Sequence, residues 1–118
     1  MMDGVPIIEG RIKLSLLEVV RRAAPHEAVG IIHLDEVYEL RNDHDFPSNN
    51  FAVDRNQLRR LVEQLDICLS DVNEEVILWH SHPSGGVGPS TADMRNKTPL
   101  KHHLVVSLVD DDLVSTWY

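Results

Sequence analysis

The segment LWHSHPSGGVGPSTADM, residues 78–94, combines residue types that bind metals with residue types that turn the chain. His80 and His82 are two apart in an apolar run, and side chains two apart on an extended strand point to the same side. The end of such a strand presents two imidazoles at one point. Gly85 and Gly86 then allow a tight turn and leave space above the two rings, because they carry no side chains.

A carboxylate follows at the start of the next predicted helix. Ser90 and Asp93 are three apart, so they lie on one side of a helix that opens at Ser90. Two neutral imidazoles and one carboxylate suit Zn²⁺, and a fourth position left for water is typical of a catalytic zinc site. Zinc lowers the pKa of such a water to about 7. A turn, a helix cap or two surface histidines explain each part separately, but their combination within residues 80–93 favours a metal-dependent hydrolase.

Hydrolysis also needs a proton carrier and a group that stabilises the developing oxyanion. Ser90 is placed to supply the second function through its hydroxyl. The proton carrier must be a carboxylate that is not itself a ligand, and spacing alone leaves four candidates: Glu27, Glu36, Glu74 and Glu75. Glu27 is distinctive because it begins an apolar strand, where a carboxylate is costly unless it has a partner or a task.

The elements that must position these residues are indicated by apolar periodicity and turn residues. Helices are predicted over 13–24, with Ser15 as N-cap, and over 55–70, with a short third helix over 90–97. Strands are predicted over residues 27–34, 36–40, 51–54, 75–80, 102–110 and 113–118. Because hairpins lie at both ends, we expect an α/β (α+β) fold: a mixed, largely antiparallel sheet flanked by helices.

Composition limits the class of protein. The 118 residues fit one domain, 1–118, and the 42% hydrophobic and 25% charged residues are ordinary for a globular chain. A net charge of −8 repels phosphate backbones, so we expect no nucleic-acid partner. No apolar run approaches 18 residues and no basic stretch precedes an apolar one at the N-terminus, so we expect no membrane contact, no secretory signal and a cytoplasmic location.

Several other residues are assigned structural roles. Cys68, the only cysteine, follows the apolar pattern of the 55–70 helix and is expected to be a buried small hydrophobe in a reducing compartment. Trp79 points away from the two imidazoles and is expected in the core. The pair His102-His103 opens a strand outside the motif and is expected to be solvated. The pair Trp117-Tyr118 is expected on an edge strand, as core packing or a dimer contact.

The order His80-Ser81-His82, seven residues, Ser90, two residues, Asp93 resembles the JAMM motif of the MPN+ (Mov34/PAD-1-like, JAB domain) metalloproteases. The upstream PHEAVGII resembles the segment that carries the catalytic glutamate of this family. The stretch LRNDHDFPSNNFAVD resembles its continuation into the second helix. The likeness runs through residues 14–118, and the motif is specific because it is long and its internal spacing is fixed.

The resemblance implies that His80, His82 and Asp93 bind one Zn²⁺ with water as the fourth ligand. It implies that Glu27 is the general base and then the acid, and that Ser90 stabilises the oxyanion. It further implies a fold related to cytidine deaminases and cleavage of a peptide or isopeptide bond. The bond often follows a C-terminal glycine of a ubiquitin-like or sulfur-carrier protein. A deaminase is not supported, because its cysteine ligands are absent.

The chain resembles the compact, stand-alone prokaryotic and phage members of this family. These include sulfur-carrier-processing peptidases and phage tail-assembly proteins, and the sequence does not separate the two. A non-catalytic MPN-type binding or assembly module that keeps the site is a further alternative. Every expected motif position is filled, which favours an active enzyme. The substrate and the oligomeric state stay open.

Overall fold

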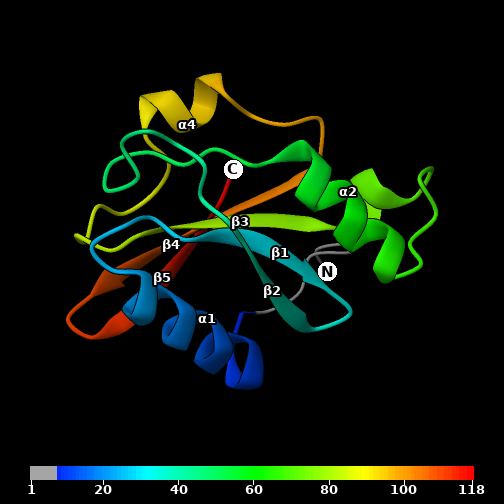
Figure 1. Cartoon of the computed structure of the whole chain (residues 1–118). Helices are drawn as coiled ribbons and strands as arrows, with labels where there is room; N and C mark the ends of the chain where they lie inside the picture. Colours follow the sequence, from blue (N-terminus) through cyan, green and yellow to red (C-terminus); the bar gives the residue numbers. More distant parts are fainter. Residues whose placement is uncertain (1–7) are drawn as a thin grey trace.

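The computed structural model describes residues 8–118 as a five-stranded sheet with helices on both faces (Figure 1). The strands are β1 (Val29–His33), β2 (Glu36–Leu40), β3 (Ile77–His82), β4 (His102–Val109) and β5 (Asp112–Trp117). The helices are α1 (Gly10–Ala23), α2 (Arg55–Gln64), α3 (Val72–Glu75) and α4 (Thr91–Arg95). The strand order is β2-β1-β3-β4-β5; β3 and β4 run parallel and the other neighbours antiparallel. The expected mixed, largely antiparallel fold is confirmed.

Two hairpins frame the sheet, and both turn through pairs of left-handed residues. Leu34 and Asp35 join β1 to β2 with φ of 49° and 64°. Asp110 and Asp111 join β4 to β5 with φ of 50° and 65°. Two consecutive positive φ values are characteristic of the type I′ turn, whose twist matches that of the flanking strands. Asp tolerates this region better than most side chains, so the acidic turn at 110–112 has a conformational cause.

The two longer helices differ from the predicted ones at their ends. Glu9 is the N-cap of α1, so the assignment of Ser15 as N-cap is wrong, and Ser15 lies inside the helix. The helix starts earlier because Ile12 continues the buried stripe one turn before Leu16. The second helix ends at Gln64 rather than at residue 70, since the chain turns at Asp66 with φ of 56°.

The segments beside α2 also depart from expectation. Residues 51–54 form no strand and contribute a single bridge, between Asn42 and Val53. Cys68 lies beyond the end of α2 and is exposed, so its assignment as a buried hydrophobe is wrong. The pair His102-His103 is buried and not solvated, because β4 is an interior strand between β3 and β5.

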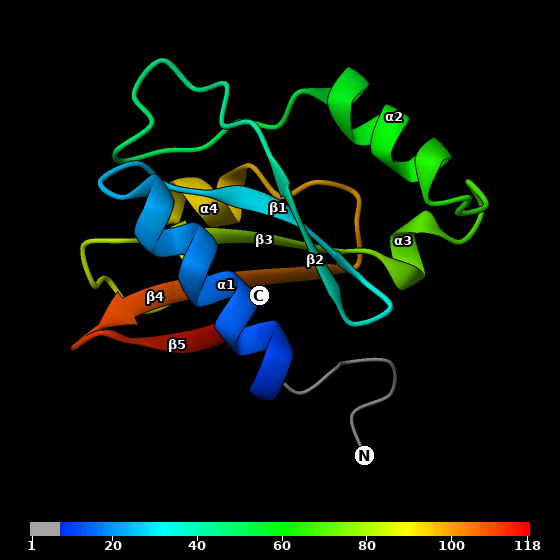
Figure 2. The same cartoon turned by 60° about the horizontal axis from the view of Figure 1, so that its bottom comes forward.

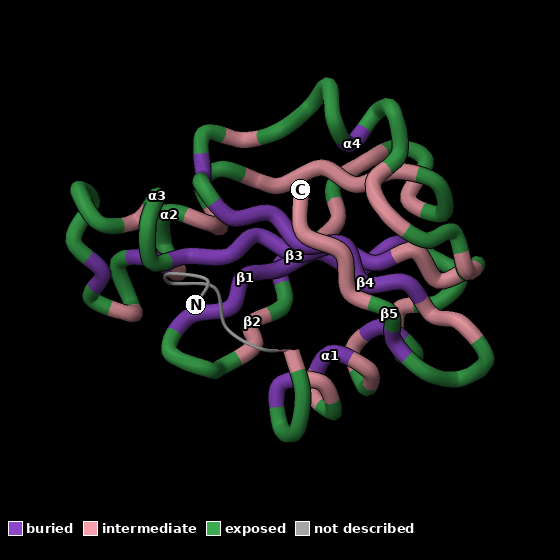
Figure 3. The backbone as a smooth tube through the Cα atoms, turned by 180° about the vertical axis from the view of Figure 1, so that it is seen from behind, coloured by how far each residue is buried: buried purple, intermediate pink, exposed green. Residues whose placement is uncertain are grey.

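The two faces of β3 bury different side chains. Ile77 and Trp79 face the cluster under α1, which crosses the sheet in Figure 2, and Trp79 is fully buried as expected. Leu78 faces the opposite side and packs with Val62 of α2. Figure 3 shows the buried backbone running along β1, β3 and β4, in the middle of the sheet. The histidines at the end of β3 therefore continue the face that carries Leu78.

No helix within residues 8–118 combines the length and the apolar character needed to cross a membrane. The expectation about the N-terminus rests largely on residues 1–7, which lie outside the described residues.

Candidate metal centre

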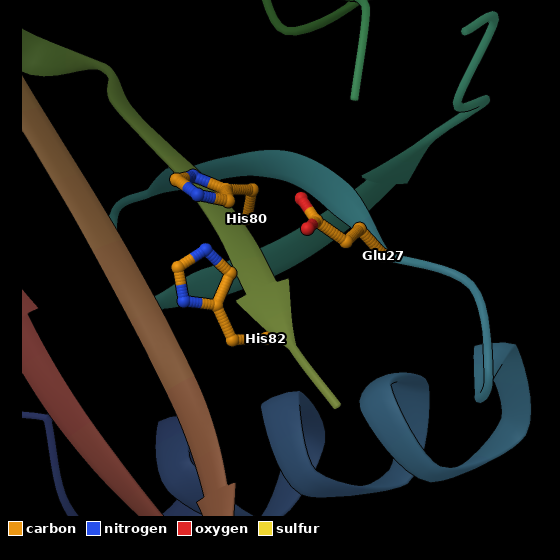
Figure 4. A group of neighbouring side chains, drawn as sticks. All are labelled: Glu27, His80 and His82. Carbon is orange, nitrogen blue, oxygen red and sulfur yellow. The ribbon is translucent and has the colours of Figure 1, made fainter. Parts of the chain in front are cut away.

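Strand pairing brings Glu27 to the two histidines. Val29 of β1 is paired with His80 of β3 in an antiparallel register, so the chain two residues before Val29 runs beside His82. Donor atoms of Glu27, His80 and His82 all lie within 4.8 Å of one another, which would allow a shared metal ion. Figure 4 shows the Glu27 carboxylate turned toward the two rings from the segment just before β1. The structure thus places three of the predicted site residues together.

Asp93 completes the group, and the cap of α4 places it there. Its Oδ2 lies 3.0 Å from His80 Nε2 and 3.2 Å from His82 Nε2. The Ser90 N–H donates to the same Oδ2 at 2.8 Å, while the Asp93 N–H donates to Ser90 Oγ at 3.0 Å. This reciprocal capping box fixes the carboxylate, which is buried. We call Glu27, His80, His82 and Asp93 the candidate metal centre.

The hydrogen bonds of His82 leave a lone pair directed into the centre. Its Nδ1 lies 2.9 Å from the carbonyl oxygen of Gly86, which can only accept, so Nδ1 carries the ring proton. In a neutral ring the Nε2 is then bare, yet it faces Asp93 Oδ2, another acceptor, at 3.2 Å. Two acceptors at this separation repel each other unless a proton or a cation lies with them. The donor set therefore fits a metal cation.

The pKa values of the two carboxylates of the centre are shifted in opposite directions. Burial, and then the negative charge of Asp93, raise the pKa of Glu27 from 4.5 to about 8. Its Oε1 is buried and has no hydrogen-bond partner among the described residues. Burial opposes ionisation of Asp93 too, but hydrogen bonds from His80 and from the Ser90 N–H outweigh it and lower the pKa of Asp93 to about 2. One carboxylate stays ionised, and the other can exchange a proton near neutral pH.

The backbone at Glu27 is held on both sides. Its N–H donates to the Pro47 carbonyl at 2.7 Å, and its own carbonyl accepts from Asn42 Nδ2 at 2.8 Å. The following N–H, of Ala28, donates to Ser81 Oγ at 2.8 Å. Ser81 lies between the two histidines in the sequence and points to the other side of β3. The middle residue of the His-Ser-His triplet thus anchors the strand end that carries Glu27.

The structure separates Glu27 from the other three carboxylates that spacing had left open. Glu36 pairs with Arg11 at 3.1 Å, and Glu74 pairs with Lys101 at 3.0 Å. Glu75 lies 3.6 Å from His33. All three have side chains more than half exposed, whereas Glu27 is buried. Only the register of β1 against β3 makes this distinction, and spacing along the chain does not contain it.

Two aromatic residues of the centre were missed or given another role in the sequence. Phe51 stacks on the His80 ring, with centroids 4.2 Å apart and planes 22° apart. The Tyr118 hydroxyl lies 3.2 Å from His80 Nδ1. Both contacts join residues distant in the sequence, so no local pattern indicates them. A cavity of about 620 Å³ opens beside the centre, lined by Phe51, Asp93 and residues of α2 and of the segment after α4.

Residues 11–118 match the family model described as prokaryotic homologs of the JAB domain. The chain belongs to this family. The resemblance seen in the histidine motif is thereby confirmed for the family. This JAB-domain homologue is also similar in fold to the solution structure of protein DSY2949 from Desulfitobacterium hafniense, at 24% identity and a TM-score of 0.67. The match covers 91% of this chain and 79% of that one. No curated protein matches the chain.

Proposed function

We propose that this JAB-domain homologue is a zinc-dependent metallopeptidase that hydrolyses a peptide or isopeptide bond. The observation that carries the proposal is geometric. Ligand atoms of Glu27, His80 and His82 lie within 4.8 Å of one another. Asp93 joins this group through its contacts with both rings, since its Oδ2 lies 3.0 and 3.2 Å from the two imidazoles. The family supports the proposal. His80, His82 and Asp93 would hold the zinc. When bound, zinc supplies Lewis acidity, which polarises a carbonyl oxygen and makes water a nucleophile near neutral pH.

Glu27 is the proton carrier in this proposal. Its buried carboxylate takes a proton from the attacking water and delivers it to the leaving amine. The free Oε1 is available for this exchange because no described residue occupies it. Backbone hydrogen bonds with Pro47 and Asn42 fix the main chain from which this carboxylate extends.

Ser90 is the proposed oxyanion donor. Its oxygen already accepts the Asp93 N–H in the capping box, but its hydroxyl proton is left to donate to a substrate oxygen. Such a donor is effective because it is held in place before the charge develops. The substrate segment would lie in the cavity beside Asp93. As the resemblance implies, we propose a segment that ends in glycine, from a ubiquitin-like or sulfur-carrier protein.

The test combines metal analysis with cleavage of fusions that carry an extension after a C-terminal Gly-Gly. Zinc-loaded wild type should cleave the fusion, and Glu27→Gln should lose about 10²–10⁴-fold in kcat, as expected for removal of a general acid-base group. The variant should retain its zinc, because Glu27 is not one of the proposed ligands. Glu74→Gln is the matched control: it makes the same change at an exposed surface pair and should leave cleavage unchanged.

Each alternative has its own outcome in this experiment. Zinc binding at one ion per chain without turnover would identify a binding or assembly module instead of a peptidase. Loss of zinc in Glu27→Gln would make Glu27 a ligand and overturn its role as proton carrier. A wild type that binds no zinc would remove the metallopeptidase proposal altogether.

A further inference from the structure

The two imidazoles of the candidate metal centre are held from behind by different kinds of group. His82 Nδ1 is bonded to a backbone carbonyl of its own loop, that of Gly86. His80 Nδ1 lies 3.2 Å from the hydroxyl of Tyr118, the residue directly after β5. We infer that Tyr118 is a positioning residue, which holds the His80 ring so that its Nε2 is directed at the metal position. The inference rests on the proposed zinc centre.

Tyr118 is itself held from several sides. Its backbone N–H donates to the His103 carbonyl at 3.0 Å, which extends the pairing of β5 with β4 by one residue. Its ring lies 5.4 Å from the His103 ring, and the Lys97 ammonium lies 5.6 Å from its centroid. The His103 ring is in turn fixed at Nε2, which accepts the Thr98 N–H at 3.2 Å. The hydroxyl therefore has a defined position relative to β3.

The Tyr118 hydroxyl opposes a half-turn of the His80 ring, which stacking on Phe51 does not prevent. Phe51 lies nearly parallel to the imidazole, so it limits tilting of the ring but does not distinguish its two nitrogens. A half-turn of the ring would replace Nδ1 by a carbon atom opposite the Tyr118 hydroxyl and break the hydrogen bond. With Nδ1 held, Nε2 is left on the side of Asp93, 3.0 Å from its Oδ2. The orientation needed for metal binding is thus favoured at both edges of the ring, by Asp93 at Nε2 and by Tyr118 at Nδ1. Only the Tyr118 contact remains available once Nε2 binds a metal.

A phenol suits this position because it can both donate and accept. While His80 Nε2–H donates to the ionised Asp93, the bare Nδ1 accepts the Tyr118 O–H. When Nε2 binds a metal through its lone pair, the ring proton is on Nδ1 and donates to the Tyr118 oxygen. Burial raises the pKa of Tyr118, so the hydroxyl keeps its proton. A carbonyl oxygen, such as that of Gly86 beside His82 Nδ1, can only accept and so fits only the arrangement in which Nδ1 carries the proton.

The test is Tyr118→Phe, which removes the hydroxyl and keeps the ring against His103 and Lys97. Zinc affinity, measured by competition with a chromogenic chelator, should fall about 10–100-fold, the usual effect of losing a hydrogen bond to a ligating histidine. The visible absorption spectrum of the cobalt-substituted protein should change as well. Tyr38→Phe is the matched control, because it removes the same atom from β2, and it should bind zinc like the wild type. Equal zinc affinity in Tyr118→Phe and wild type would overturn the inference.

A second measurement separates this inference from the proposed function. In the metal-free protein, the imidazole ¹⁵N shifts of His80 should show a hydrogen-bonded Nδ1 acceptor in the wild type. In Tyr118→Phe the Nδ1 shift should move and that of His82 should stay. If the wild type binds no zinc, the proposed function fails while the nitrogen shifts still decide the role of Tyr118. Unchanged His80 shifts in Tyr118→Phe would reject that role even if zinc binds.

Discussion

The sheet carries an apolar cluster beneath α1 on one face and a group of buried polar side chains at the end of β3 on the other. Beneath α1, the single polar atom of Trp79 donates to the Ile31 carbonyl at 3.3 Å, so burial leaves it satisfied. In the candidate metal centre, Glu27 Oε1 has no described partner and His82 Nε2 faces an acceptor. The first region stabilises the fold, and the second holds groups that are costly until something binds them.

A single strand serves both regions. Trp79 and His80 are neighbours in β3, both almost completely buried, and they point to opposite faces. Strand alternation therefore separates the two roles by one residue. The comparison predicts that substitutions on the α1 face lower stability, whereas selected substitutions in the centre raise it.

The largest expected effect is that of Trp79→Ala. Removing this ring from beneath α1 leaves a cavity, so the free energy of unfolding should fall by about 3–5 kcal/mol. Urea denaturation followed by circular dichroism measures the loss. The exposed Leu14→Ala on α1 is the control and should change stability by less than about 0.5 kcal/mol. A loss in Trp79→Ala no larger than in the control would refute the assignment of the core.

Gly30→Ala should cause the second-largest loss of stability, because β1 leaves no room for a side chain there. An added Cβ would lie 1.9 Å from the Tyr38 carbonyl oxygen and 2.8 Å from the Trp79 ring. The carbonyl belongs to β2 and cannot move without disturbing the β1–β2 pairing, so a loss of about 2–3 kcal/mol is expected by the same denaturation. Gly86→Ala makes the identical change where the nearest atom is 3.9 Å away. If the two variants lose the same free energy of unfolding, the close approach of Tyr38 and Trp79 does not explain the glycine at position 30.

Local spacing sufficed for the parts of the centre that lie on one element. The period of a strand brings His80 and His82 to one face, and the capping box brings Asp93 to the start of α4. Glu27 needed more, because its place depends on the register of β1 against β3, and spacing had left it beside three other glutamates. The resemblance to the family, and not the residues alone, singled it out.

The contacts that the sequence did not reveal are long-range. Phe51 contacts His80 from a loop, and Tyr118 contacts it from the end of β5. No periodic pattern in the sequence predicts such long-range contacts. The error in the predicted end of the second helix also led to a wrong prediction of burial. Apolar residues continue past Gln64, so Cys68 looked buried, but the chain turns at Asp66 and leaves the thiol exposed. Packing of the β4 strand between two others likewise buried histidines that looked solvated in isolation.

The centre itself is tested by Glu27→Gln in metal-free protein. With its pKa raised from 4.5 to about 8, the folded protein holds a proton that the unfolded chain loses, so wild-type stability falls as the pH rises through this window. Glutamine stays neutral and avoids this loss. At pH 8 the variant should be more stable by about 1–3 kcal/mol, and near pH 4 the two should converge.

Unfolding in urea with a chelator present, repeated from pH 4 to 8, measures this difference. Glu74→Gln again serves as the control and should show no comparable pH dependence, since its partner Lys101 is exposed. The same Glu27→Gln change that removes the proposed proton carrier is thus expected to stabilise the fold, a trade-off often found at active sites. A Glu27→Gln variant less stable than wild type at pH 8 would mean that Glu27 stabilises the folded protein and does not destabilise it.

Asp54→Ala should give the smallest effect and the opposite dependence on pH. Asp54 is the N-cap of α2, and hydrogen bonds from the Gln57 and Asn56 N–H groups, which outweigh a small effect of burial, lower its pKa. Its contribution is present above the unfolded pKa of about 3.9 and is lost as the pH falls through the lower folded value. The variant should therefore be slightly less stable at pH 7 and approach the wild type in acid. Asp45→Ala, in the exposed loop, should match the wild type throughout. The difference in stability between variant and wild type should therefore change with pH in opposite directions for Asp54→Ala and Glu27→Gln. That result would show that a carboxylate with hydrogen-bond partners stabilises this fold and one without them does not. The same pH dependence in both variants would contradict this distinction.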